Sequence, residues 1–202
     1  MIGNDIVDLR DADARPGARH PRFDARVFCA AERAALAASS APDRLRWVFW
    51  AAKEAAYKVA RKLDAACVFS PSLFAVEFES ASLGTVDFGQ ARFPVHVNDV
   101  HHGVHVVATQ PSARRSRIVT GSREMTDAAS RDAAAPGLAV RELALSQLSS
   151  CWPDSRVLAV AQEGRIPVLE SDGVRVDADL SLSHHGRWVA FACEIPQNAE
   201  LA

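Results

Sequence analysis

The chain of 202 residues is 49% apolar and carries a formal net charge of −2, with a pI near 6.4. This length and apolar fraction are enough for one large or two small hydrophobic cores. The balanced charge and the lack of a long basic run argue against a nucleic-acid-binding protein, and no apolar run approaches the ~20 residues that a membrane-spanning helix needs.

The first part of the chain is predicted to form a strand, two helices and an antiparallel sheet. The pattern of residues 2–9 predicts a strand, and runs of good helix formers predict helices over 23–39 and 42–63. Alternating or mixed apolar character predicts three further strands, at 74–79, 91–97 and 101–109. This order indicates a first lobe, which we place at residues 1–112.

The second part of the chain is predicted to repeat this plan of helix followed by sheet. Residues 110–137 are rich in Ser, Arg, Asp and Ala, and we expect them to contain the crossing between two lobes, in part without regular order. A helix is predicted over 138–152. The strands predicted after it lie at 156–162, 167–169, 180–183 and 188–193. The second lobe takes residues 113–202, and the predicted fold class is α+β, with helices packed on antiparallel sheets.

Glu54 and Lys58 are four residues apart in the second predicted helix and therefore share one face. A carboxylate beside an ammonium suits a magnesium ion bound to a substrate phosphate, because magnesium prefers oxygen ligands and lysine neutralises phosphate charge. The alternative is an ordinary exposed ion pair, which is common and contributes roughly a few tenths of a kcal/mol. The spacing alone favours that alternative, so the neighbouring motifs have to decide.

Two short motifs lie in the first predicted strand and in the second helix. The first is Gly3-Asn4-Asp5, and the second is Trp50-Ala51-Ala52-Lys53-Glu54-Ala55-Ala56-Tyr57-Lys58. Together they resemble the signature of the 4'-phosphopantetheinyl transferases. Between them, residues 22–32 are similar to the arginine-bearing helix start of the short form of the family, the holo-acyl-carrier-protein synthases. The resemblance implies an enzyme that uses magnesium to move the phosphopantetheine arm of coenzyme A onto a serine of a carrier protein. Adenosine 3',5'-bisphosphate is the implied leaving group.

By this resemblance, Asp5 and Glu54 are the metal ligands and Lys58 is a phosphate contact, so these three form the expected catalytic set. Glu54 is also the candidate base, because attack on a phosphoryl centre needs neutralised charge and a base for the incoming hydroxyl. In a regular strand Asp8 points to the opposite face from Asp5, since side chains alternate. The long form of the family, named for the enzyme that activates surfactin synthetase, has an extra acidic ligand where this chain has Val7. We expect water in its place.

Two motifs in the second half resemble elements of the long form. Gly164-Arg165-Ile166-Pro167 is similar to a Gly-Lys-Pro element, and Ser183-His184 is similar to the start of a Ser-His-Ser element. In the long form these elements precede the Gly-x-Asp strand, whereas here they follow it. The chain therefore resembles a circular permutation of the two-lobed enzyme, which predicts that Ala202 and Met1 are neighbours.

The same resemblance implies that Arg165, Ser183 and His184 contact coenzyme A phosphates in a cleft between two lobes related by a pseudo-twofold axis. Arginine in place of lysine keeps the charge but offers a planar fork instead of a point. The alternative for His184 and His185 is a place in an ordinary turn between two strands.

The expected partners are coenzyme A and an acyl or peptidyl carrier protein. Carrier proteins are typically acidic, so we assign Arg22 and Arg26, beside Arg15 and Arg19, to carrier binding. Solvated arginines at a helix start are the alternative. A single chain with both lobes implies a monomer. The scattered cysteines and the lack of a signal-peptide pattern lead us to expect a cytoplasmic location.

The sequence therefore predicts a magnesium-dependent 4'-phosphopantetheinyl transferase with holo-acyl-carrier-protein synthase activity. Its carrier would serve fatty acid, polyketide or nonribosomal peptide synthesis. The alternative is a noncatalytic relative that binds a carrier protein or coenzyme A, because Val7 replaces an acidic ligand and Arg165 replaces a lysine.

Overall fold

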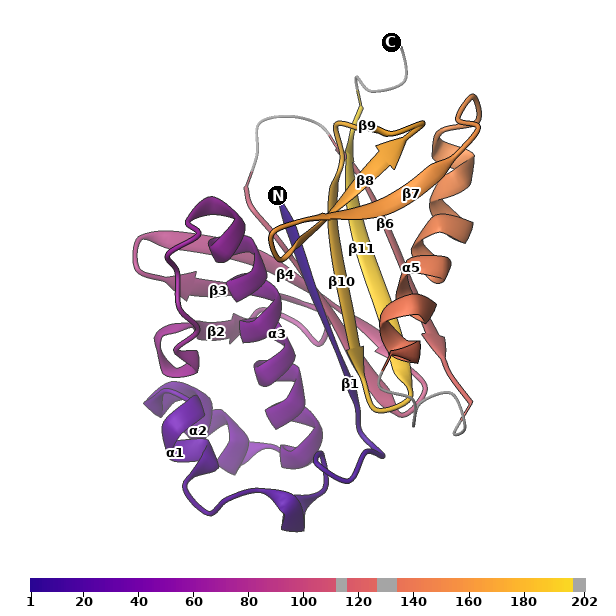
Figure 1. The fold of residues 1–202 in the computed structure, drawn as a ribbon. Coiled ribbons are helices and arrows are strands. Elements are labelled where there is room, and N and C mark those ends of the chain that lie inside the picture. Colours follow the sequence, from indigo (N-terminus) through magenta and orange to yellow (C-terminus); the bar gives the residue numbers. More distant parts are fainter. Residues whose placement is uncertain (112–115, 127–133, 198–202) are drawn as a thin grey trace.

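The computed structural model describes residues 1–111, 116–126 and 134–197. Two antiparallel sheets meet along the first strand of the chain (Figure 1). The strands are β1 (Ile2–Asp8), β2 (Ala75–Phe78), β3 (Leu83–Phe88), β4 (Ala91–Val100), β5 (Gly103–Thr109), β6 (Ser116–Glu124), β7 (Leu158–Glu163), β8 (Ile166–Ser171), β9 (Val174–Arg175), β10 (Asp179–His185) and β11 (Trp188–Pro196). The first sheet has the order β1-β5-β4-β3-β2 and the second has the order β10-β11-β6. Strands β7, β8 and β9 form a smaller sheet beside β10.

A helix packs on each of the two main sheets. The α-helices are α1 (Phe23–Val27), α2 (Ala30–Ala38), α3 (Pro42–Leu63) and α5 (Ala135–Leu148), and short 3-10 helices lie at Pro16–Ala18, Pro71–Leu73 and Ser149–Cys151. Helix α3 covers the five-stranded sheet, and α5 contacts β6, β10 and β11 (Figure 1). The larger apolar core joins residues between Val7 and Ala108, and a second core joins residues between Met125 and Ile195. Each main sheet therefore has its own helix and its own core.

Helix α3 lies close to β1 because its buried face is made of small side chains. The helix begins at Pro42, which suits a first turn where the missing N–H is not needed. The alanines of this face that have no exposed surface are Ala51, Ala52, Ala55 and Ala56. Alanine also has the highest helix propensity, so the same residues favour the helix and its close packing.

Strand β1 joins the two layers. It pairs with β5 along one side and lies beside β10 on the other, as Figure 1 shows between α3 and α5. Side chains alternate along a strand, so the odd-numbered residues of β1 face α3 and the even-numbered ones face β10 and β11. The apolar contacts on the second face are Ile2 with Val107 and Ala192, and Ile6 with Trp188 and Ala190.

The α+β class predicted from the sequence is confirmed, with several differences in detail. The single helix predicted over 23–39 is wrong, because the chain breaks at Phe28 and Cys29, where Cys29 and Glu32 form a reciprocal cap for α2. Strands β3, β6 and β9 were not predicted, since their polar and glycine residues resemble loop composition.

The lobe boundary at residue 112 and the pseudo-twofold relation stay predictions. Parts of the expected crossing, 112–115 and 127–133, and Ala202 lie outside the described residues.

Two further observations concern the described part of the chain. None of its helices combines the length and the apolar composition that crossing a membrane would require. The four cysteines are free, and Cys193 is buried whereas the others are partly exposed.

Candidate active site

Gly3 sets the distance between β1 and α3. A Cβ atom added to Gly3 would lie 2.1 Å from the carbonyl oxygen of Ala55 and 3.1 Å from Cβ of Lys58. Only glycine allows this approach, because a helical backbone oxygen cannot move aside without disturbing the helix. The glycine of the Gly-x-Asp motif therefore brings the strand against the helix, and Asp5 reaches the helix face that carries Lys58.

Asp5, Glu54 and Lys58 come together where β1 crosses α3. The Lys58 ammonium donates to the carbonyl oxygen of Asn4 at 2.7 Å and lies 3.3 Å from Oδ1 of Asp5. Burial raises the pKa of Glu54 to about 7, and the charge of Asp5 adds to this shift while Lys58 opposes it. Burial also raises the pKa of Asp5, against the influence of Lys58. The site thus combines two carboxylates, one of which feels the charge of the other, with one ammonium.

The two carboxylates fit a hard divalent cation. Magnesium binds one or two carboxylates together with substrate phosphates and keeps several waters, and the Asp5 side chain is still 15% exposed. A bound cation would remove the repulsion that helps to raise the pKa of Glu54. Within the described residues, no group of three or more His, Cys, Asp or Glu side chains is placed to hold a metal. Substrate oxygens and water would therefore complete the coordination shell of the cation. Val7 offers no ligand, because its side chain is apolar and buried.

The residues expected to contact coenzyme A phosphates have three different environments. Burial lowers the pKa of His184, the charge of Lys58 adds to this shift, and the charge of Asp5 opposes it. His184 is therefore close enough to the site to feel the charges of both residues. Ser183 is buried in the junction, and its hydroxyl accepts a hydrogen bond at 2.9 Å from an amide side chain of β1. Arg165 is exposed in the turn between β7 and β8, and among the described residues no hydrogen bond or ion pair joins it to the site.

Polar side chains of β10 hold the other side of β1, a feature that we did not predict from the sequence. The bonds run from the N–H of Ile2 to Oδ2 of Asp179 (2.5 Å), from the N–H of Asn4 to Oγ of Ser181 (2.9 Å) and from the N–H of Asp8 to Nδ1 of His185 (3.2 Å). The Asn4 side chain also contacts Nε2 of His105 at 3.2 Å, and burial lowers the pKa of His105 to about 4. Alternate β10 side chains thus satisfy alternate N–H groups of β1. The available signal was the polar residue at every second position of β10, namely Asp179, Ser181, Ser183 and His185.

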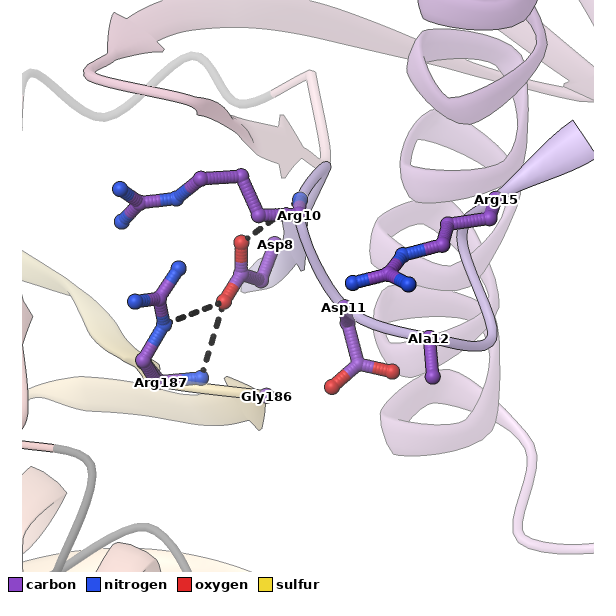
Figure 2. A pocket seen from close by; sticks show the side chains of 7 residues that line it. All are labelled: Asp8, Arg10, Asp11, Ala12, Arg15, Gly186 and Arg187. Carbon is purple, nitrogen blue, oxygen red and sulfur yellow. Dashed lines mark hydrogen bonds and ion pairs between the residues drawn. The ribbon is translucent and has the colours of Figure 1, made fainter.

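Asp8 joins the end of β1 to the turn between β10 and β11 (Figure 2). Its side chain is buried, its Oδ1 accepts from the N–H of Arg10 at 2.9 Å, and its Oδ2 accepts from the N–H of Arg187 at 3.1 Å. Gly186 makes the turn with φ +54°, and a Cβ there would lie 2.8 Å from Oδ2 of Asp8. Beside it opens a hollow of about 710 Å³, lined also by Asp11, Ala12 and Arg15. Since β1 pairs regularly along its length, Asp8 does not face the same side as Asp5.

The arginines assigned to carrier binding lie around the short helix α1. Arg22 and Arg26 are exposed, and so is Arg15, whereas Arg19 pairs with Asp43 at 2.8 Å. Helix α1 lies near the N-terminal end of α3 (Figure 1). The two assigned arginines are therefore accessible to an acidic partner.

Comparison with known proteins bears on the first part of the chain. A family model described as the 4'-phosphopantetheinyl transferase superfamily matches residues 1–116, which is more than half of the chain and includes Asp5, Glu54 and Lys58. No curated protein and no solved structure matches the chain. Residues Arg165, Ser183 and His184 lie outside the matched range.

Proposed function

This chain belongs to the 4'-phosphopantetheinyl transferase superfamily, and we propose that it transfers the 4'-phosphopantetheine arm of coenzyme A to a serine hydroxyl of an apo carrier protein. This is holo-acyl-carrier-protein synthase activity, with a carrier from fatty acid, polyketide or nonribosomal peptide synthesis. The observation that carries the proposal is the convergence of Asp5 and Glu54, from elements far apart in the sequence, beside Lys58. Magnesium is the proposed cofactor, held by the two carboxylates.

The chemistry assigns a task to each residue of the set. The bound cation would neutralise phosphate oxygens during the transfer. Glu54, a carboxylate at the place where the substrate would bind, is the proposed general base that accepts the proton of the serine hydroxyl. The serine oxygen bonds to the phosphorus that carries pantetheine, and the bond from this phosphorus to adenosine 3',5'-bisphosphate breaks. Lys58 adds positive charge beside the phosphates.

His184 is the proposed coenzyme A contact from the second sheet, because it lies close enough to feel the charges of Lys58 and Asp5. Its lowered pKa favours the neutral imidazole, which can still donate one hydrogen bond to a phosphate oxygen. Ser183 would have to release its present bond to reach a phosphate, so its role, like that of Arg165, rests on the motif resemblance alone.

Arg22 and Arg26 are proposed to receive the acidic carrier, and their exposure supports this role. We also infer a cytoplasmic two-lobed monomer whose element order resembles a circular permutation of the long form. The position of the first residue supports the permutation, because the N-terminal ammonium of Met1 lies 2.8 Å from Oε2 of Glu194 in the last described strand.

The proposal is tested by incubating the purified protein with coenzyme A, magnesium and several apo carrier proteins, and then measuring the mass of each carrier. We expect at least one carrier to gain the phosphopantetheine arm, and chelation of magnesium to prevent the gain. No gain on any carrier would favour the noncatalytic relative that binds carrier protein or coenzyme A, for which the apolar Val7 is the specific observation.

A further inference from the structure

Lys58 and Lys62 lie one helical turn apart on α3 and reach the same side of β1, but their ammonium groups are bonded to different extents. Among the described residues, Lys58 has two acceptors, Asn4 and Asp5, and its side chain is 28% exposed. The side chain of Lys62 is 7% exposed, and its ammonium has three acceptors. These are the carbonyl oxygen of Ile2 (2.7 Å), Oδ1 of Asp179 (2.8 Å) and the carbonyl oxygen of Leu180 (2.8 Å). An ammonium has three N–H groups, so Lys62 is saturated.

The spacing of the two lysines matches the spacing of the strand. Four helical residues rise ~6 Å and two strand residues advance ~6.8 Å, so successive turns of α3 meet alternate carbonyls of β1, those of Ile2 and Asn4. Asp179 completes the contact at Ile2, because its Oδ2 accepts the Ile2 N–H at 2.5 Å. The N–H and the C=O of Ile2 are therefore both held by the ion pair that joins α3 to β10.

We propose that Lys62 and Asp179 are positioning residues that fix β1 between α3 and β10, so that Asp5 keeps its place when Lys58 turns toward the substrate phosphates. This inference rests on the proposed function. Lys58 cannot hold the strand and a phosphate with the same N–H groups, whereas Lys62 has none to spare. The proposed site draws residues from β1, α3 and β10, and a misplacement of ~1 Å costs up to about 100-fold in rate.

The test compares Lys62→Met with Arg61→Met. Arg61 is the preceding residue on α3, and its side chain makes no hydrogen bond or ion pair within the described part of the chain, so its variant controls for loss of charge. We expect Lys62→Met to lower kcat about 10- to 100-fold and to raise the magnesium concentration needed for half-maximal rate. The KM for the carrier protein should not change. Arg61→Met should stay within about twofold of the wild type.

Asp179→Asn provides a second variant in case Lys62→Met folds poorly, because the amide keeps the shape and an oxygen for the Ile2 N–H. The effects of Lys62→Met and Asp179→Asn on kcat should not add in the double variant, since both break one contact. Amide hydrogen exchange supplies a measurement that needs no catalysis. Strand β1 should exchange faster in Lys62→Met than in Arg61→Met, while α5 exchanges at the same rate in both.

Three outcomes would count against the positioning role. Equal kcat and magnesium dependence in Lys62→Met, Asp179→Asn and Arg61→Met would overturn it in an otherwise active enzyme. A lower melting temperature with unchanged kcat per folded molecule would show that the ion pair serves stability alone. Absence of transfer by the wild-type protein would defeat the proposed function and this role with it, whatever the exchange of β1.

Discussion

The two sides of β1 differ in how completely their polar groups are bonded. Toward β10, the N–H groups of Ile2, Asn4 and Asp8 each have a side-chain acceptor, although Oδ1 of Asn4 has no partner among the described residues. Toward α3, Asp5 and Glu54 lie together, and burial, with a further contribution from the charge of Asp5, raises the pKa of Glu54 to about 7. The first side holds the two sheets together, and the second holds charge that a ligand would neutralise.

This contrast shows that incomplete bonding, rather than burial of charge, marks the site. Lys53 is as buried as any residue of the core, and burial lowers its pKa. Its ammonium nevertheless has a full set of acceptors, which are Glu32 and the carbonyl oxygens of Pro71 and Phe74. A shifted pKa therefore supports the proposed site only where hydrogen-bond partners are also missing.

The largest effect is expected from Asp5→Asn and Glu54→Gln on the incompletely bonded side. Transfer should fall on the order of 10³-fold, because a bound cation contributes several kcal/mol of charge stabilisation. Stability should not fall, since each change removes repulsion with little change in volume. Carrier mass and thermal unfolding, measured on the same samples, check both statements. Full magnesium-dependent activity in both variants would mean that the cation binds elsewhere.

Lys53→Met tests the opposite case, a fully bonded charge that should matter for stability alone. Glu32 would remain buried without its ammonium, at a cost of about 3–5 kcal/mol, and the melting temperature should fall by about 10 °C. Transfer per folded molecule should change little. The control is Arg92→Met, which breaks an exposed pair with Asp87 and should leave the melting temperature nearly unchanged. Equal melting temperatures for the two variants would contradict this distinction.

Gly3→Ala should disturb the contact between the two elements that carry the site. The added Cβ collides with the Ala55 carbonyl oxygen, so we expect a loss of about 1–3 kcal/mol of stability together with slower transfer. Gly17→Ala is the matched control, because a Cβ there meets nothing within 4 Å. Denaturant unfolding of both variants measures the difference. If the two proteins were equally stable, β1 and α3 would not be as close as the structure has them.

The pH dependence of the magnesium requirement sharpens the comparison on the α3 side. Because the pKa of Glu54 is about 7, its proton competes with the cation below that pH, and the half-saturating magnesium concentration should be ~10-fold higher at pH 6 than at pH 8. In metal-free protein the sign for stability is opposite. Folded Glu54 keeps a proton that the unfolded chain has lost, so stability should fall as pH rises from 4.5 to about 7. Thermal unfolding of the wild type and of Glu54→Gln across this pH range checks the sign. The same pH dependence of the melting temperature in both proteins would contradict the raised pKa of Glu54.

Local motifs could be predicted from the sequence better than contacts between distant segments. Strand β1 and helix α3 were predicted because each motif lies within one strongly patterned element. The break before α2 was missed because it depends on Glu32, which caps Cys29 and also accepts from Lys53 and the N–H of Val76. Strand β6 has the composition of a loop and exists as a strand through its pairing with β11.

The same limit applies to the site. The spacing of Glu54 and Lys58 alone favoured an ordinary ion pair, and their assignment, like that of Asp5, came from the motif resemblance, in which the glycine has a clear packing reason. Lys62 and Asp179 were not found, because they are 117 residues apart and neither belongs to a local pattern. The motif resemblance predicts that His184 contacts coenzyme A, which stays a prediction, whereas the burial of Ser183 depends on a contact with β1 that the motif does not contain.

The side-chain contacts along β1 have a further consequence for the behaviour of the protein at high concentration. A border strand with open N–H and C=O groups is a template for aggregation, because another chain can extend the sheet. Here a carboxylate, a hydroxyl and an imidazole of β10 occupy the outward N–H groups of Ile2, Asn4 and Asp8, and two lysines of α3 occupy the outward carbonyls of Ile2 and Asn4. These groups offer no continuing ladder, so the junction also protects β1 from pairing with a second molecule.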